Sequence, residues 1–142
     1  MSLQSANRKQ GATGEAIVAM ELRSRGVYLV ERVHTPWGIQ RAKGGRITGA
    51  YPLEKVAGDF VGILAGGRFV RVEVKTTDGR LPYSQLEPHQ HSALLQHHEL
   101  GGLSLVGWVH DGVVSIMQYP VTGWVAGKSI RKEDVIEWAL DG

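Results

Sequence analysis

The chain contains no cysteine among its 142 residues, which excludes disulfide bridges, thiolate zinc sites and cysteine nucleophiles. It also lacks long hydrophobic runs. The longest apolar stretch, 103–109, is interrupted by Ser104 and Gly107 and is far shorter than the roughly 20 residues that a membrane span requires. No segment has the pattern of a signal peptide, and we expect a cytoplasmic protein. Repeats and proline-, glycine- or serine-rich linkers are missing as well, so residues 1–142 are expected to form a single domain.

What the sequence does contain is an uneven distribution of charge. Residues 1–46 carry eight basic and three acidic side chains, a net charge of +5, whereas the remainder carries −3. A basic segment on a nearly neutral protein favours a polyanion such as nucleic acid as partner, although an ordinary solvated surface would also account for it. The hydrophobic content of 42% is sufficient for a folded core.

The order of hydrophobic patterns predicts alternating helices and strands. We expect helices over 14–25, 88–100 and 130–140, strands over 27–34, 59–64, 69–75, 103–109 and 112–119, and an exposed loop or extension over 37–53. One helix separates the strands at 69–75 and 103–109, so a right-handed crossover should make them parallel. The predicted fold class is therefore α/β, a mixed sheet flanked by helices.

Capping residues set the limits of the predicted helices. Thr13 is the expected N-cap of the first helix and Gly26 its left-handed stop, while Pro88 opens the second helix. Within that second helix, Leu94 and Leu95 are expected to be buried.

The hairpin formed by the strands at 59–64 and 69–75 is the most informative feature. A three-residue turn over 65–67, which its glycines permit, places Asp59 opposite Glu73. A two-residue turn would place Asp59 opposite Val74 instead. Because side chains alternate along a strand, Glu73 and Lys75 share one face.

Asp59, Glu73 and Lys75 would then lie together in an otherwise apolar sheet. Two carboxylates at that distance repel each other unless a cation lies between them, and oxygen ligands suit Mg²⁺ or Mn²⁺. The Lys75 ammonium could orient or deprotonate a metal-held water, or stabilise charge on a phosphate. A salt-bridged strand face is the simpler interpretation, but unpaired charge within an apolar sheet is costly.

The combination of Asp59 with Glu73-Val74-Lys75 after a hairpin resembles the PD-(D/E)XK nuclease superfamily. Further landmarks, in the same order along the chain, resemble RecU-type Holliday-junction resolvases. These landmarks are Asn7-Arg8, Gly11-x-x-x-Glu15, Thr35-Pro36, Leu81-Pro82, His89-Gln90, Gly101-Gly102 and Lys128-Ser129-Ile130.

The resemblance implies a restriction-endonuclease-like fold with a short basic extension. It also implies a metal-dependent DNA endonuclease that resolves four-way junctions in recombination and repair. We expect the Val74 carbonyl to lie beside the carboxylates of Asp59 and Glu73 as a third oxygen ligand of the metal. By resemblance, Glu15 is a further acid near the metal and Gln90 a polar residue near the scissile phosphate.

Contacts with DNA phosphates are expected from Arg8 and from Arg41, Lys43 and Arg46 on the glycine-rich segment. A symmetric homodimer would match the two-fold symmetry of a four-way junction. Two other functions stay open at this point. One is another superfamily endonuclease that acts on a different DNA structure or sequence, and the other is a DNA-binding module with a degenerate site.

Several of these residues also have ordinary structural explanations. Glu15 could make a helix-dipole contact, Gln90 could be a solvated first-turn residue, and the basic segment could be a solvated loop. A zinc site formed by His89, His91, His97 and His98 is disfavoured because neighbouring histidines on a helix point in different directions. Trp108, Trp124 and Trp138 are expected to be packing residues.

Overall fold

A computed structural model of the chain describes the backbone of residues 3–33, 37–52 and 59–140. Its elements are α1 (Leu3–Ser24), β1 (Tyr28–Arg32), β2 (Trp37–Arg41), β3 (Ile47–Pro52), β4 (Phe60–Ile63), β5 (Phe69–Thr76), β6 (Arg80–Pro82), the 3-10 helix η1 (Tyr83–Gln85), α2 (Pro88–Glu99), β7 (Leu103–His110), β8 (Val113–Tyr119), β9 (Ser129–Arg131) and the 3-10 helix η2 (Lys132–Asp134). Neither helix is long and apolar enough within the described residues to span a membrane.

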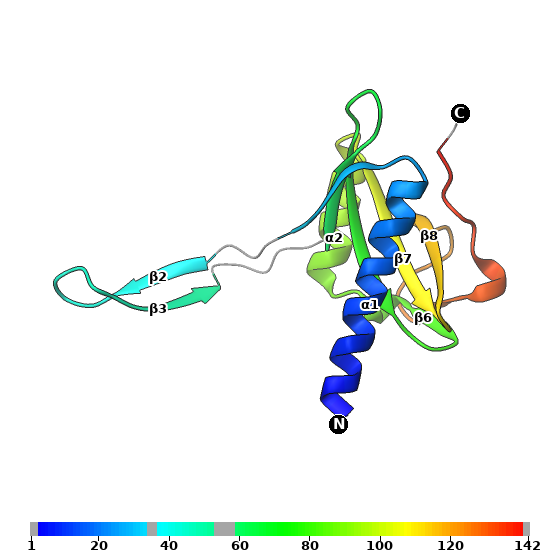
Figure 1. Ribbon diagram of the computed structural model, residues 1–142. Helices are drawn as coiled ribbons and strands as arrows, with labels where there is room; N and C mark the ends of the chain where they lie inside the picture. The colour runs from blue at the N-terminus through cyan, green and yellow to red at the C-terminus, as the bar shows by residue number, and fades with distance from the viewer. Residues whose placement is uncertain (1–2, 34–36, 53–58, 141–142) are drawn as a thin grey trace.

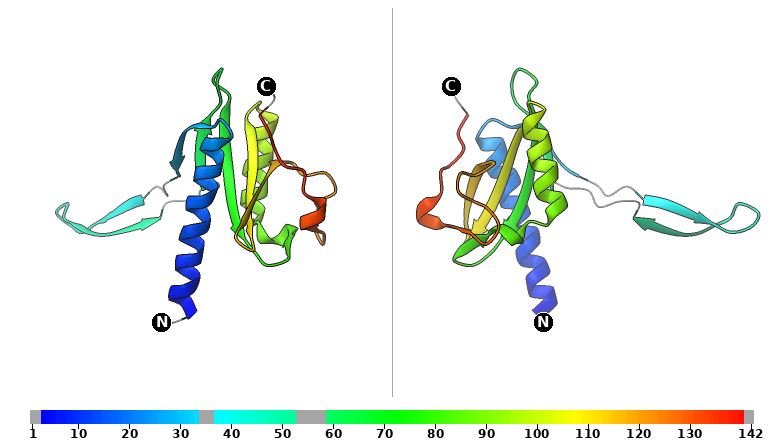
Figure 2. Two further views of the ribbon diagram at one scale, coloured as in Figure 1. Left: turned by 45° about the vertical axis from the view of Figure 1, so that its right-hand side comes forward. Right: turned by 180° about the vertical axis from the view of Figure 1, so that it is seen from behind.

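A five-stranded sheet in the order β1-β4-β5-β7-β8 forms the centre of the molecule (Figure 1). β5 and β7 run parallel and every other neighbouring pair is antiparallel, which confirms the predicted mixed sheet and its crossover. α1 lies on one face of the sheet and α2 on the other (Figure 2). The α/β fold expected from the sequence is therefore correct.

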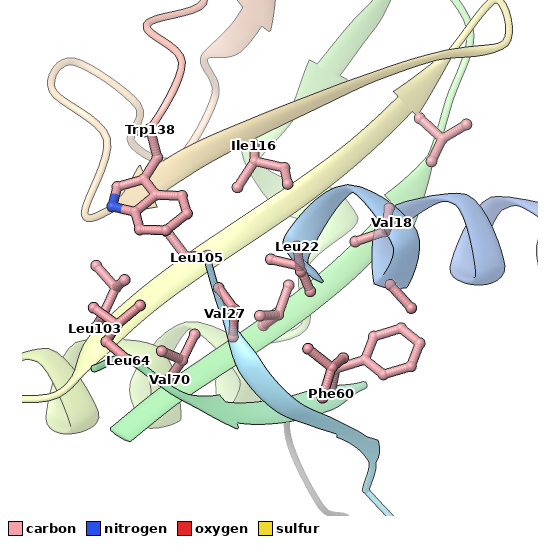
Figure 3. Close-up of a cluster of buried hydrophobic side chains, with 14 residues drawn as sticks. Val18, Leu22, Val27, Phe60, Leu64, Val70, Leu103, Leu105, Ile116 and Trp138 are labelled. Carbon is pink, nitrogen blue, oxygen red and sulfur yellow. The ribbon is translucent and has the colours of Figure 1, made fainter. Parts of the chain in front are cut away.

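Each helix covers its own hydrophobic cluster. The α1-face cluster contains Val18, Leu22, Phe60, Val70, Val72, Leu105, Ile116 and Trp138, among others (Figure 3). The α2-face cluster contains Leu81, Leu86, Leu94, Val106, Trp108, Met117, Tyr119, Trp124 and Ile130. All three tryptophans singled out from the sequence are buried in these clusters, as predicted. Since Val70 and Val72 face α1, alternation turns the intervening charged positions of β5 toward α2.

α1 begins at Leu3, eleven residues before the predicted start, so Thr13 lies inside the helix and is not its N-cap. The early residues have no apolar stripe, but they are mostly good helix formers, and propensity alone is compatible with helix there. The C-terminal end of α1 agrees with the prediction, because Gly26 adopts the left-handed conformation that stops a helix, with a φ of 99°. The Leu95 prediction is wrong: that side chain is 41% exposed.

The predicted helix over 130–140 is not present. Ile130 instead pairs with Leu81 in the β6–β9 ladder, and η2 follows. Ile130 belongs to the α2-face cluster, whereas Trp138 belongs to the α1-face cluster and donates its backbone N–H to the Ile116 carbonyl at 2.6 Å. A short helix cannot serve two opposite faces of a sheet, so this segment is extended.

The segment predicted as an exposed loop or extension is a hairpin of β2 and β3 that projects away from the sheet (Figure 1). Its turn closes with hydrogen bonds from the Ala42 N–H to the Arg46 carbonyl and from the Gly45 N–H to the Ala42 carbonyl, at 2.8 and 3.0 Å. Gly44 and Gly45 both have positive φ, which this turn requires. The Thr35-Pro36 landmark lies outside the described residues.

Candidate active site

The β4–β5 hairpin has the register that the sequence predicts. A turn over 65–67 is closed by hydrogen bonds from the Leu64 N–H to the Arg68 carbonyl and from the Gly67 N–H to the Leu64 carbonyl, both at 2.9 Å. Phe60 lies opposite Val72, so the residue that precedes β4, Asp59, falls opposite Glu73. The three-residue turn therefore brings the two acids to one place on the sheet.

The Asp59 carboxylate is held directly against β5. Its Oδ2 accepts a hydrogen bond from the backbone N–H of Val74 at 2.6 Å, while the Asp59 N–H donates to the Val72 carbonyl at 2.7 Å. Asp59 is half-buried. These two bonds hold the Asp59 carboxylate at the backbone N–H of Val74, the residue that follows Glu73.

Glu73 is a buried carboxylate, with only 2% of its surface exposed. Its Oε1 accepts a hydrogen bond from Gln90 Nε2 at 2.8 Å, and Lys75 Nζ lies 3.9 Å from the same oxygen. Desolvating an anion is costly, so a buried carboxylate of this kind is held by specific hydrogen-bonding and charged partners.

Gln90 joins α2 to this carboxylate. It is the third residue of the helix, where its Oε1 accepts from the Glu87 N–H at 2.8 Å and completes a capping box with the Glu87 side chain. Its Nε2 donates to Glu73. One side chain thus caps the helix and orients Glu73, a double role that the sequence did not reveal.

His91 connects α2 to β8 and to η1 through hydrogen bonds. The ring Nε2 lies 2.8 Å from the Tyr83 carbonyl, which can only accept, so Nδ1 accepts from the Tyr119 hydroxyl at 2.8 Å. Burial raises the pKa of Tyr119 to about 12, so this hydroxyl keeps its proton. His91 is therefore a structural residue that holds the helix carrying Gln90.

Glu15 makes an ion pair with Arg32, with Glu15 Oε2 and Arg32 Nη2 2.7 Å apart. Arg32 lies opposite Phe60, whose side chain faces α1, so this ion pair lies on the α1 side of the sheet, whereas alternation turns Asp59 and Glu73 toward α2. Among the described residues, no three His, Cys, Asp or Glu side chains are placed to hold one metal ion. A metal role for Glu15 stays a prediction. Arg32 was missed from the sequence because its importance depends on strand pairing.

The basic residues at the tip of the hairpin are exposed and lie away from the acids. Arg41, Lys43 and Arg46 surround the turn, and Arg41 Nη1 donates to the Gly45 carbonyl at 2.8 Å. Arg8 lies on α1, and its side chain is outside the described residues. The structure therefore separates a buried acidic site from an exposed basic extension.

The donor set at the acidic site fits a hard divalent cation. Asp59 and Glu73 supply carboxylate oxygens, and the Val74 carbonyl as a third oxygen donor stays a prediction. Oxygen donors of this kind suit Mg²⁺ or Mn²⁺ rather than softer metals. The burial of Glu73 limits water around the site and strengthens electrostatic interactions there.

A family model described as Recombination protein U (RecU) matches residues 17–113, more than half of the chain. The chain belongs to the RecU family. The matched span of this RecU-family protein contains Asp59, Glu73, Lys75 and Gln90. No curated protein matches this chain.

The fold of this RecU-family protein is similar to that of a solved structure. Hjc from Archaeoglobus fulgidus, described as a Holliday junction resolvase from an archaeal hyperthermophile, aligns with a TM-score of 0.56 and 18% sequence identity. The alignment covers 87% of this chain and 90% of Hjc. The likeness supports the nuclease-like α/β fold expected from the sequence.

Proposed function

We propose that this RecU-family protein is a metal-dependent endonuclease that resolves four-way (Holliday) junctions in recombination and repair. The observation that carries the proposal is the register of β4 and β5, which brings Asp59 to the buried Glu73, with Lys75 on the same strand face. The RecU family, and the resolvase activity named for the similarly folded Hjc, support four-way junctions as the substrate.

In this proposal Asp59, Glu73, the Val74 carbonyl and Glu15 hold Mg²⁺ or Mn²⁺. Such an ion, when bound, polarises the scissile phosphate and lowers the pKa of a water molecule. The chain's own contribution is to fix the ligands: the Val74 N–H orients Asp59, and Gln90 orients Glu73. Lys75 places an ammonium beside Glu73, where it can stabilise negative charge on the reacting phosphate.

Binding of DNA in this proposal depends on exposed basic side chains. Arg41, Lys43 and Arg46 on the β2–β3 hairpin, together with Arg8 on α1, contact phosphates. Residues 1–142 form a single nuclease domain that acts as a symmetric homodimer, because paired cuts in two strands need two active sites.

A cleavage assay tests the activity and its substrate together. A synthetic four-way junction and a linear duplex of the same sequence are incubated with the protein in Mg²⁺ and in EDTA. We expect symmetric cuts in the junction only, and only with Mg²⁺. Equal cutting of the linear duplex would favour another nuclease of the superfamily. Binding without cutting would favour a DNA-binding module.

The oligomeric state is tested separately by light scattering and sedimentation at micromolar concentration, with and without junction DNA. We expect a dimer in both conditions. A monomer in both would contradict the two-site arrangement.

A further inference from the structure

The small β6–β9 ladder carries a pair of basic residues, and its strand β6 lies on the opposite side of the molecule from the β2–β3 hairpin (Figure 1). Arg80 pairs directly with Arg131, and Leu81 pairs with Ile130. Leu81 and Ile130 are buried in the α2-face cluster, so alternation turns both arginines outward, where they are exposed. The two arginines thus occupy directly paired, exposed positions on the surface.

This placement is unfavourable for the isolated protein, because like charges directly opposite each other on an antiparallel ladder repel. The acids nearby in sequence are Asp78, Glu133 and Asp134, yet within the described part of the chain neither arginine forms an ion pair. The adjacent Lys132, in contrast, is paired with Asp111. Internal salt bridges therefore do not account for the two arginines, whereas an external anion would.

The pair is close to the candidate active site. Arg80 follows Lys75 by five residues, and an extended chain spans at most about 3.6 Å per residue, so the two lie within about 18 Å. The link is short and ordered: the Thr77 N–H donates to the Val109 carbonyl at 3.1 Å, and its hydroxyl donates to the Arg80 carbonyl at 2.6 Å. Glu73, Lys75 and the β6–β9 ladder all lie on the α2 side of the sheet.

We propose that Arg80 and Arg131 form a second DNA-contact surface, which binds the phosphates of the duplex arm adjacent to the cut. A planar guanidinium matches two phosphate oxygens, and two neighbouring guanidiniums match consecutive phosphates of a strand. At about 3.4 Å per base pair, an 18 Å separation corresponds to about five base pairs. The hairpin and this surface would then hold DNA on two sides of the same site. Only the distance to the cut rests on the proposed nuclease function.

The salt dependence of binding tests this surface without any cleavage. Binding of the full chain to a synthetic four-way junction is measured by fluorescence anisotropy in EDTA over a salt series. Arg80→Gln with Arg131→Gln should lower the salt slope by up to about 1.8, or about 0.9 for each phosphate that the protein no longer neutralises. Thermal stability should stay unchanged or rise, because a like-charge pair has been removed.

Lys132→Gln is the matched control. It removes the same unit charge from the residue next to Arg131, but Asp111 already neutralises that charge, so its slope should match the wild type. An unchanged slope in the double variant, or a change no larger than in the control, would overturn the proposal. So would a change in oligomeric state by light scattering, which would assign the arginines to a protein interface.

A second measurement places the DNA-contact surface relative to the cut. After the cut is mapped, uncharged methylphosphonates replace the phosphates within about five base pairs of it. This DNA should bind the wild-type protein more weakly but leave the affinity of the double variant unchanged. Equal losses of affinity for both proteins would place the arginines elsewhere on the DNA and overturn the assignment to the adjacent arm. If the wild type cuts no DNA, the proposed function fails, while the salt slopes still decide whether the arginines bind phosphates.

Discussion

The β4–β5 pair and the β2–β3 hairpin are both antiparallel strand pairs joined by turns with two consecutive glycines at positive φ, but they place charge in opposite surroundings. β4 and β5 continue into the five-stranded sheet, and Glu73 within them is 2% exposed. The hairpin forms a separate two-stranded sheet whose basic side chains are exposed. Similar local geometry thus gives a fixed carboxylate in one pair and solvated cations in the other.

The difference follows from what covers each pair. A buried charge must be satisfied by specific partners, such as Gln90 and Lys75 at Glu73, and this requirement fixes its position. An exposed charge needs no fixed partner and attracts any polyanion within the screening length. We therefore expect the chemistry to depend on the carboxylates of the sheet, and DNA affinity to depend on exposed basic side chains such as those of the hairpin.

The largest expected effect is on cleavage. Asp59→Asn or Glu73→Gln should reduce the rate of junction cleavage by about a thousandfold or more, because each removes charge from the metal site. DNA affinity in EDTA should be unchanged. Lys75→Ala should also severely slow the cut. Asp78→Asn and Glu99→Gln, which alter exposed acids, are the matched controls. Wild-type cleavage by the Asp59 variant would refute the site.

The same substitution, isoleucine to alanine, should lower the free energy of unfolding by very different amounts in the two regions. Ile116 in β8 is fully buried, whereas Ile39 in β2 is 51% exposed. Ile116→Ala should lower the free energy of unfolding by about 2–5 kcal/mol, and Ile39→Ala by no more than about 0.5 kcal/mol. Urea denaturation of both variants measures the difference. Similar decreases would mean that the hairpin is packed against the body.

DNA affinity, unlike stability, should respond strongly to substitutions in the β2–β3 hairpin. Replacing Arg41, Lys43 and Arg46 by alanine should lower the salt slope of junction binding by up to about 2.7, and weaken binding by up to about a hundredfold near 0.15 M salt. The cleavage rate at saturating protein should change little. The charge-conserving variant R41K/K43R/R46K is the control and should retain the slope. An unaffected slope in the alanine variant would mean that these residues are ordinary solvated charges that do not contact DNA.

The smallest of these effects concerns Gln90. Gln90→Met removes the donor to Glu73 without adding a charge beside the carboxylates, and should weaken Mg²⁺ binding about 10- to 100-fold. Calorimetric titration with Mg²⁺ measures this directly, without DNA. Gln96→Met on the same helix changes an exposed residue and serves as the matched control. An unaltered Mg²⁺ affinity would show that Gln90 does not position Glu73.

Local signals in the sequence were enough to predict the hairpin register. Gly66 and Gly67 restrict the turn, and once the turn is fixed, alternation places Asp59 and Glu73 on one face. The parallel pairing of β5 and β7 follows from the crossover rule in the same way. These features depend only on residues near one another in the chain, or on general topology.

The features that sequence reasoning missed depend on distant contacts. The bridge from Gln90 to Glu73 joins residues on different elements, and the pairing of Glu15 with Arg32 requires α1 to lie beside β1. The sequence pattern of residues 130–140 is that of an amphipathic helix, but the apolar residues Ile130 and Trp138 pack on opposite faces of the sheet. Periodicity cannot distinguish one buried face from two.

The position of Trp138 also has a consequence for the order in which the two hydrophobic clusters form. This residue packs in the α1-face cluster and its carbonyl accepts a hydrogen bond from Arg25 at 2.9 Å, while Glu137 forms an ion pair with the same arginine. The α1-face cluster thus joins residues from Val18 to Trp138, whereas the buried members of the α2-face cluster lie between Leu81 and Ile130. The entropy cost of closing a loop rises with the length of chain that it contains. The core under α2, the helix that carries Gln90, should therefore form before the core under α1.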